Sequence, residues 1–350
     1  MTTRIVIVGA VGGYFGAYLT RAGHAVTLVD GWPDHVEAMR RDGLQISGVT
    51  PAEAFSVRVD AVHLNDVQAF ARQQTIDIAI IAVKAYDTEW ATALIRPYLA
   101  PSGYIVSLQN GINEDRIAAI VGWGKAVGCI VAQFASELHA PGRIRRNYPR
   151  GDANTVIYRT GEASGRMTER VEAFTALAAD VDTARATPNL WGERWSKLCV
   201  NGMRNALSAA SGLAGNEINR VRKIRRFGIR LGGEAVRIGQ ALGYPLERIY
   251  GLVPERLARA AEGDTPALAE IEDSLMAAAN RSGRSDLQRP SMGQDILKGR
   301  RTEVDFINGL IVASGREAGL PVEAHETVTR LVQRIERGEI RPSPDHFPQA

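Results

Sequence analysis

A lysine and two asparagines recur at four-residue intervals inside the segment NLWGERWSKLCVNGMRNALS, residues 189–208. A helix would place Lys197, Asn201 and Asn205 on one face. An ammonium group can donate a proton to a developing alkoxide, while carboxamides orient the reacting molecule. The pattern therefore suits a site that binds a carbonyl and a carboxylate. The alternative is an exposed helix face, although asparagine is a poor helix former and gains nothing there over Glu or Gln.

Two further polar residues follow in the same half of the chain. Ser291, in the sequence RPSMGQ, can cap a helix, with Gln294 completing a capping box. Glu303 begins a predicted helix, where an acid complements the helix dipole. Their position alone leaves a structural role and a site role open for both.

A glycine-rich turn stands between a predicted strand and a predicted helix near the start of the chain. The turn consists of Gly9, Ala10, Val11, Gly12 and Gly13. Glycine lets the main chain approach a pyrophosphate, and a helix N-terminus offers N–H groups and a positive dipole end to bind it. The G-x-G-x-x-G fingerprint has two glycine intervals, and Gly9 and Gly12 supply only the second. The turn predicts a dinucleotide site, and the alternative is a tight turn that binds no nucleotide.

The next predicted strand, Ala25–Asp30, ends in a carboxylate. At that place an acid can accept hydrogen bonds from the adenosine ribose hydroxyls, and it would repel a 2′-phosphate. Asp30 therefore favours NAD(H) over NADP(H). The alternative is a turn or capping acid in front of Gly31, Trp32 and Pro33.

The elements that must position these residues show two periodicities. The predicted strands are Arg4–Val8, Ala25–Asp30, Phe55–Ala61, Ile76–Val83, Tyr104–Gln109, Ala126–Phe134 and Thr155–Thr160. Because helical patterns lie between them, we expect an α/β fold with a doubly wound parallel sheet. From Thr187 the sequence reads only as helices, such as Thr302–Ala318. The expected parts are a dinucleotide-binding domain at 1–186, a helical domain at 187–335 and a tail at 336–350.

Composition limits the function classes. A formal charge of +3, from 42 Lys and Arg against 39 Asp and Glu, is too small for a protein that binds nucleic acid. Cys129 and Cys199 lie in apolar stretches without metal-ligand spacing, so neither a disulfide framework nor a metal site is expected. The N-terminal apolar run is too short for a signal peptide, and no stretch approaches the roughly 18 apolar residues of a membrane span. We expect a cytoplasmic protein that binds no membrane.

On five motifs the chain resembles the ketopantoate reductase (2-dehydropantoate 2-reductase) family, from residue 4 to about 335. The motifs are IVGAVGGYFGAYL, IAVKAYDT, SLQNGIN, WSKLCVNGMRNALSA and PSMGQDILKGRRTEVDFINGLI. The resemblance implies a Rossmann-type domain that binds NADPH. It also implies an all-helical C-terminal domain similar to that of 6-phosphogluconate dehydrogenase, with the active site in the cleft between the two.

The resemblance also implies a role for each candidate residue. Lys197 would be the catalytic acid, and Glu303 would sit by the nicotinamide and the substrate. The implied substrate-binding residues are Asn110, Asn201, Asn205 and Ser291. The implied cofactor-binding residues are Gly9, Ala10, Val11, Gly12, Gly13, Asp30, Lys84, Asn110 and Glu303.

The chain departs from the family pattern in three places. Members usually read G-A-G-A-V-G-G where this chain has GAVGG, so the turn is shortened. Members commonly have an arginine or a similar group for the 2′-phosphate of NADP(H), where this chain has Asp30. The chain is also longer than a typical member, and much of the excess lies between Gly212 and Asp286.

The sequence therefore predicts an NAD(P)-dependent oxidoreductase that reduces a 2-oxo acid similar to ketopantoate to its 2-hydroxy acid, as in pantothenate biosynthesis. The nearest alternative is an NAD-dependent dehydrogenase of another 2-hydroxy acid or a secondary alcohol, outside pantothenate synthesis. A third is a non-catalytic protein that senses nucleotide. The expected partner is the small-molecule acid, and a homodimer is one option for the assembly.

Overall fold

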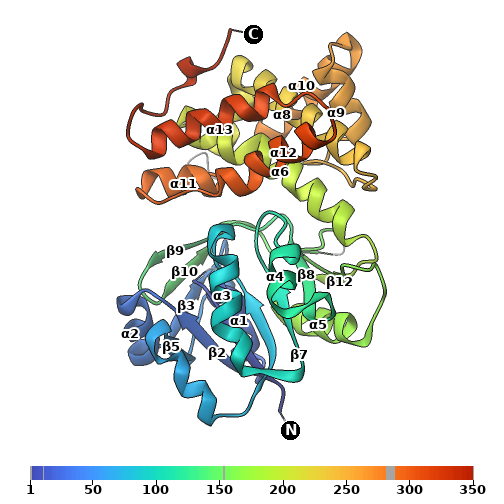
Figure 1. Cartoon of the computed structure of the whole chain (residues 1–350). Helices are drawn as coiled ribbons and strands as arrows, with labels where there is room; N and C mark the ends of the chain where they lie inside the picture. The colour runs from blue at the N-terminus through green and yellow to red at the C-terminus, as the bar shows by residue number, and fades with distance from the viewer. Residues whose placement is uncertain (1, 11, 153, 281–287, 350) are drawn as a thin grey trace. The chain divides into compact units, whose positions relative to one another are not determined.

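A computed structural model describes residues 2–10, 12–152, 154–280 and 288–349. The chain forms two compact units, Met1–Leu190 and Trp191–Ala350 (Figure 1). The first unit combines a large sheet with helices, and the second is built from helices. This confirms the predicted fold class.

The large sheet of the first unit has the strand order β12-β11-β8-β7-β6-β1-β2-β5. Its strands are β1 (Arg4–Val8), β2 (Ala25–Asp30), β5 (Asp60–His63), β6 (Ile76–Ile81), β7 (Leu99–Ser107), β8 (Ala126–Val131), β11 (Tyr158–Glu162) and β12 (Ala184–Ala186). The neighbouring strands β8, β7, β6, β1, β2 and β5 are all parallel, in the order of a dinucleotide-binding fold. The sheet is not wholly parallel, however, because β11 pairs antiparallel with β8 after the chain has left the sheet and returned.

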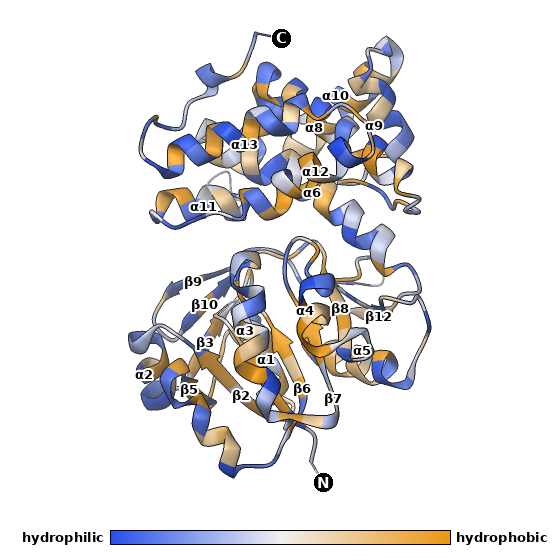
Figure 2. Cartoon of the chain, viewed as in Figure 1, coloured by the Kyte–Doolittle hydropathy of each residue, from blue (hydrophilic) through white to orange (hydrophobic). Residues whose placement is uncertain are grey.

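Helices cover both faces of this sheet. They are α1 (Gly12–Arg21), α2 (Pro33–Asp42), α3 (Thr88–Ile95), α4 (Glu114–Val121) and α5 (Glu169–Val181). The side chains of β1 alternate between two apolar clusters, with Ile5 and Ile7 in one and Val6 and Val8 in the other. This two-sided burial explains the continuous apolar strands, which carry the hydrophobic colour in Figure 2.

A second, four-stranded sheet with the order β4-β3-β10-β9 was not predicted. Its strands are β3 (Leu44–Ser47), β4 (Phe55–Val57), β9 (Ser136–Ala140) and β10 (Arg143–Arg146). The single edge strand predicted at Phe55–Ala61 is wrong, because that segment divides between β4 of this sheet and β5 of the large one. Alternation of side chains along a segment does not reveal a change of sheet within it.

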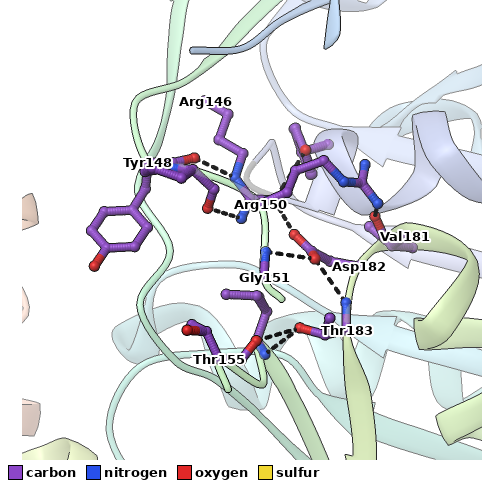
Figure 3. Close-up of polar contacts among 11 residues, drawn as sticks. Arg146, Tyr148, Arg150, Gly151, Thr155, Val181, Asp182 and Thr183 are labelled. Atoms are coloured by element: carbon purple, nitrogen blue, oxygen red, sulfur yellow. Dashed lines mark hydrogen bonds and ion pairs between the residues drawn. The ribbon is translucent and has the colours of Figure 1, made fainter. Parts of the chain in front are cut away.

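A buried ion pair ties the small sheet to the rest of the first unit. Arg146, at the end of β10, pairs with Asp182 after α5, and both side chains are almost fully buried. The guanidinium also donates to the hydroxyl of Tyr14 in the first turn of α1, at 3.2 Å. The carboxylate of Asp182 accepts from the main-chain N–H groups of Gly151 and Thr183 (Figure 3). One charged pair thus joins β10, α1 and the end of α5.

The second unit consists of helices in its described part. They are α6 (Leu190–Ser211), α7 (Gly215–Arg220), α8 (Arg222–Ala241), α9 (Pro254–Ala261), α10 (Thr265–Asn280), α11 (Ser291–Leu297), α12 (Val304–Glu317) and α13 (Glu323–Glu336). No helix in the described ranges is long and apolar enough to cross a membrane.

The last residues of the chain pack against the second unit. The ring of Phe347 is buried and meets Phe227 of α8 edge to face, with centroids 5.0 Å apart. Ser343 donates its N–H to the carbonyl of Ala210, near the end of α6, at 3.0 Å. The chain end thus contributes to the core of this unit.

We predict that Arg146→Met destabilises the protein by about 3–5 kcal/mol, because it leaves the buried carboxylate of Asp182 without its counter-charge. The measurement is the denaturant-unfolding free energy. Arg41→Met is the matched control, since Arg41 pairs with Asp42 at the exposed surface and such pairs contribute about 0–1 kcal/mol. Equal losses from the two variants would contradict the importance of the buried pair.

Candidate active site

The polar stripe of the second unit lies along α6. Lys197, Asn201 and Asn205 occupy successive turns of one face of this helix. Lys197 and Asn201 are half-buried, and Asn205 is 8% exposed. Neighbouring positions such as Trp195 and Leu198 are buried in the core. The stripe therefore begins at two half-buried residues of a largely buried helix and ends at a buried asparagine.

Ser291 comes close to this stripe. The Nδ2 atom of Asn205 donates to Oγ of Ser291 at 3.3 Å. The predicted capping box is wrong, because Pro290 occupies the N-cap position of α11 and Ser291 is already its first helical residue. The hydroxyl therefore does not cap the helix and instead meets an asparagine of the stripe.

Glu303 occupies the N-cap position of α12, and its side chain is only 2% exposed. The carboxylate does not cap the helix by a hydrogen bond. A buried carboxylate beside a helix start is favoured by the helix dipole. Its predicted role toward cofactor and substrate stays a prediction.

A polar network that the sequence analysis did not predict joins α6 to neighbouring helices. Asn308 of α12 donates from Nδ2 to the carbonyl of Gly202, at 3.1 Å, and lies 3.1 Å from Nδ1 of His325. The other ring nitrogen, Nε2, donates to the carbonyl of Leu231 at 2.8 Å. Complete burial lowers the pKa of His325 to about 4, so the ring is neutral. The network joins α6 to α8, α12 and α13 one residue after Asn201.

In the first unit, the candidate cofactor residues follow four neighbouring strands. The glycine turn follows β1, Asp30 ends β2, Lys84 follows β6, and Asn110 follows β7. Because these strands are parallel, their carboxyl ends meet at one edge of the sheet. The strand order reverses between β1 and β6, which is where open α/β sheets bind their ligands.

The glycines of the turn permit close packing. Gly9 has φ +112°, and a Cβ there would lie 2.8 Å from main-chain atoms of Ala82 and Val83. A Cβ on Gly12 would lie 2.3 Å from the side chain of Ile7. Side chains are thus excluded at both positions, as a dinucleotide-binding turn requires. Val11 lies outside the described residues.

The turn itself accepts two of the N–H groups that begin α1. The N–H of Gly12 donates to the carbonyl of Gly9 at 3.1 Å, and that of Gly13 to the carbonyl of Ala10 at 3.0 Å. In helix N-terminal anion sites such groups point at the anion. The edge therefore fits a dinucleotide, and the N–H groups of Gly12 and Gly13 already bond within the turn.

Lys84 and Asn110 are half-buried in loops that are tied together. Gln109 donates from Nε2 to the carbonyl of Val83 at 3.0 Å and to the hydroxyl of Thr88 at 2.9 Å. Gln109 was not singled out from the sequence, and its only signal was its place beside Asn110 at the strand end. Its bonds fix the two loops relative to one another.

Asp30 is half-buried and accepts the main-chain N–H of Trp32 through Oδ1, at 2.8 Å. This contact is the turn-forming role that is the alternative to ribose binding for Asp30. A carboxylate has a second oxygen, so the contact does not remove its negative charge from the end of β2.

Two family models together match most of the chain. The model "Ketopantoate reductase PanE/ApbA" matches residues 5–157, and "Ketopantoate reductase PanE/ApbA C terminal" matches residues 189–336. The chain belongs to the ketopantoate reductase family. As a member, it is an enzyme of the NAD(P)-dependent oxidoreductase class that acts on a CH–OH group.

Relatives with this name align over nearly the whole chain. The 2-dehydropantoate 2-reductase of Archaeoglobus fulgidus is 27% identical, over 96% of this chain and 98% of its own. That of Pyrococcus abyssi is 29% identical, over 91% and 93%. A ketopantoate reductase from Ralstonia eutropha matches in structure with TM-score 0.76 and 28% identity, over 96% and 99%. D-mandelate dehydrogenase shares the fold, with TM-score 0.75 and 22% identity, over 95% and 99%.

The shortened turn yields a prediction about cofactor affinity. Insertion of Gly-Ala after Ala10 recreates the G-A-G-A-V-G-G pattern and should free N–H groups at the start of α1 for the pyrophosphate. Calorimetry should then show tighter binding of the dinucleotide than in the unaltered protein. Unchanged or weaker binding would mean that the native turn is already a full pyrophosphate site.

Proposed function

We propose that the protein reduces a 2-oxo acid, ketopantoate or a close analogue, to the corresponding 2-hydroxy acid. The observation that carries this proposal is the stripe on α6, where Lys197 and Asn201 precede an asparagine bonded to Ser291. The names of the aligned relatives support the same substrate.

In the proposed reaction, C2 of the 2-oxo acid would receive a hydride, which is the chemistry that a bound nicotinamide would supply. Lys197 donates a proton to the carbonyl oxygen as negative charge develops there, which yields the hydroxyl group. Asn201, Asn205 and Ser291 offer amide and hydroxyl groups that orient the carbonyl and the carboxylate. In the oxidative direction, the neutral amine of Lys197 would accept the same proton.

Glu303 and the residues of the first unit complete the proposal. The buried carboxylate of Glu303 would help place lysine and substrate. Lys84, Asn110 and the glycine turn would bind the cofactor. A nucleotide sensor would need no proton donor. Measured turnover of a 2-oxo acid would therefore distinguish this proposal from a nucleotide sensor.

A second candidate is the NAD-dependent oxidation of another 2-hydroxy acid or a secondary alcohol, outside pantothenate synthesis. The observation that favours it is Asp30, which stands where family members commonly neutralise a 2′-phosphate. A screen of 2-oxo acids with NADH and NADPH, followed at 340 nm, distinguishes the two candidates. A homodimer and a cytoplasmic location stay predictions.

We predict that NADH gives a higher kcat/KM than NADPH. The carboxylate of Asp30 can bind ribose hydroxyls but repels a 2′-phosphate. Asp30→Asn removes the charge and should narrow the difference, measured by steady-state kinetics with both cofactors. Asp34→Asn, an exposed acid in the first turn of α2, is the control. If NADPH is the better cofactor of the unaltered enzyme, the role assigned to Asp30 is wrong.

We predict that Lys197→Ala lowers kcat by roughly 10²–10⁴, the range for loss of a general acid. Lys197→Arg should not restore activity, because a guanidinium holds its proton too tightly. The measurement is kcat at saturating substrate and cofactor, with the unfolding midpoint as a check on folding.

Lys298→Ala is the matched control, since Lys298 is an exposed lysine at the end of α11. It should leave kcat nearly unchanged. A loss of less than about tenfold in Lys197→Ala, with an unchanged midpoint, would exclude Lys197 as the proton donor.

A further inference from the structure

The segment 242–253, between α8 and α9, is fastened to α6 on both sides of Lys197 along the chain. The N–H of Glu247 donates to Oγ of Ser196 at 2.8 Å. The ring of Tyr250 lies against the guanidinium of Arg204, with 4.2 Å from Cζ to the ring centroid. The segment therefore lies next to the helix that carries the polar stripe.

Tyr250 has a backbone conformation that its residue type disfavours. Ile249 and Leu252 exchange both main-chain hydrogen bonds, at 2.9 and 3.0 Å, across a two-residue turn. The two turn residues, Tyr250 and Gly251, have φ +56° and +85°. Such turns favour Asn and Gly, and an aromatic residue at positive φ costs free energy. Strain of this kind often marks a side chain that the protein uses.

Arg204 lies near the face of α6 that carries the stripe, because it follows Lys197 by seven residues, or about two turns. Its Nη1 donates to Oδ1 of Asn219 at 3.1 Å, and its Nη2 donates to the carbonyl of Gly215 at 2.7 Å. Both of these acceptors are neutral, and together they orient the guanidinium.

The guanidinium also lies beside the segment that leads into Ser291. A Cβ added to Gly215 would lie 3.5 Å from Nη2 of Arg204 and 3.9 Å from Cδ of Pro290. Pro290 directly precedes Ser291, whose hydroxyl meets Asn205. An oriented cation thus lies near the contact between Asn205 of the stripe and Ser291 of α11.

We propose that Arg204, held under the ring of Tyr250, binds the carboxylate of the 2-oxo acid. This inference rests on the proposed function and assigns a residue to the acid group of the substrate. A guanidinium can donate two parallel N–H hydrogen bonds to a carboxylate and also carries the opposite charge. A carboxamide carries no charge. The ring of Tyr250 covers one face of the guanidinium and so restricts its orientation. The competing role is structural, a tie between α6 and α7.

The test compares a charged and an uncharged substrate. The substrates are the 2-oxo acid that the unaltered enzyme reduces best and the methyl ester of that acid. Arg204→Gln should raise KM for the acid by about ten- to a hundredfold, the loss expected for a hydrogen bond to a charged group. KM for the ester, which lacks the charge, should change little. Equal effects on acid and ester, or no effect on either, would overturn the proposal.

Two further variants separate binding from structure. Tyr250→Gly removes the ring and relieves the positive φ, so it should keep or raise the unfolding midpoint while raising KM for the acid. Arg220→Gln is the matched control, because Arg220 ties α7 to the carbonyl of Ala279 in α10. It should leave KM for the acid unchanged. A lowered midpoint with unchanged KM in Tyr250→Gly would assign the ring a purely structural role and overturn the proposal.

A direct binding measurement keeps this inference distinct from the reductase proposal. If the unaltered enzyme reduces no 2-oxo acid, the proposed function fails. Calorimetry with pantoate as the probe then still tests Arg204. Binding that is at least about tenfold weaker in Arg204→Gln supports a carboxylate site. Equal affinities, or no binding to the unaltered protein, would overturn it.

Discussion

The close approach of α6 to α12 and α13 at Gly202 is the constraint on which the second unit depends. A Cβ at this position would lie 3.0 Å from both Cε1 of His325 and Cδ1 of Ile311. The absence of a side chain lets Asn308 bind the carbonyl of Gly202, while a neutral His325 bonds to α8. Because Asn201 adjoins Gly202 and Glu303 begins α12, the same contact fixes two proposed site elements relative to one another. Burial lowers the pKa of His325 from its usual value near 6.5 to about 4, so only the unfolded chain readily binds a proton there. The contribution of the neutral His325 to the free energy of unfolding is therefore complete above about pH 6.5 and falls progressively towards pH 4.

The first unit depends on a different constraint, which is the parallel direction of its central strands. Parallel pairing of β2, β1, β6 and β7 delivers Asp30, the glycine turn, Lys84 and Asn110 to one edge, although they are far apart in sequence. Burial on both faces stabilises these strands in the interior of the unit. The small sheet supports the same edge, because a Cβ on Gly13 would meet Ile144 of β10 at 2.8 Å. The start of α1 is thus held by the sheet below it and by β10 beside it.

Local patterns were sufficient for much of the architecture. The alternation of strands and helices, the all-helical second half and the helix that carries Lys197 follow from periodicity and turn chemistry. The second sheet could not be predicted, because its pairing of β3 with β10 joins distant segments. For the same reason, the sequence predicted a helix cap at Ser291. Its hydroxyl instead contacts Asn205, which lies on a separate helix. Arg204 and Tyr250 gave no signal beyond a Tyr-Gly pair, since positive φ at a tyrosine is imposed by tertiary contacts.

The central claim is that this protein transfers a hydride to C2 of a 2-oxo acid. The most direct measurement uses NADH deuterated at C4 of the nicotinamide, with mass spectrometry and NMR of the 2-hydroxy acid formed from ketopantoate. The account predicts one deuterium atom per product molecule, bonded to C2, because the hydride comes from the nicotinamide while Lys197 supplies only the hydroxyl proton. A product without deuterium at C2, or the absence of product from every 2-oxo acid offered with either cofactor, would contradict it.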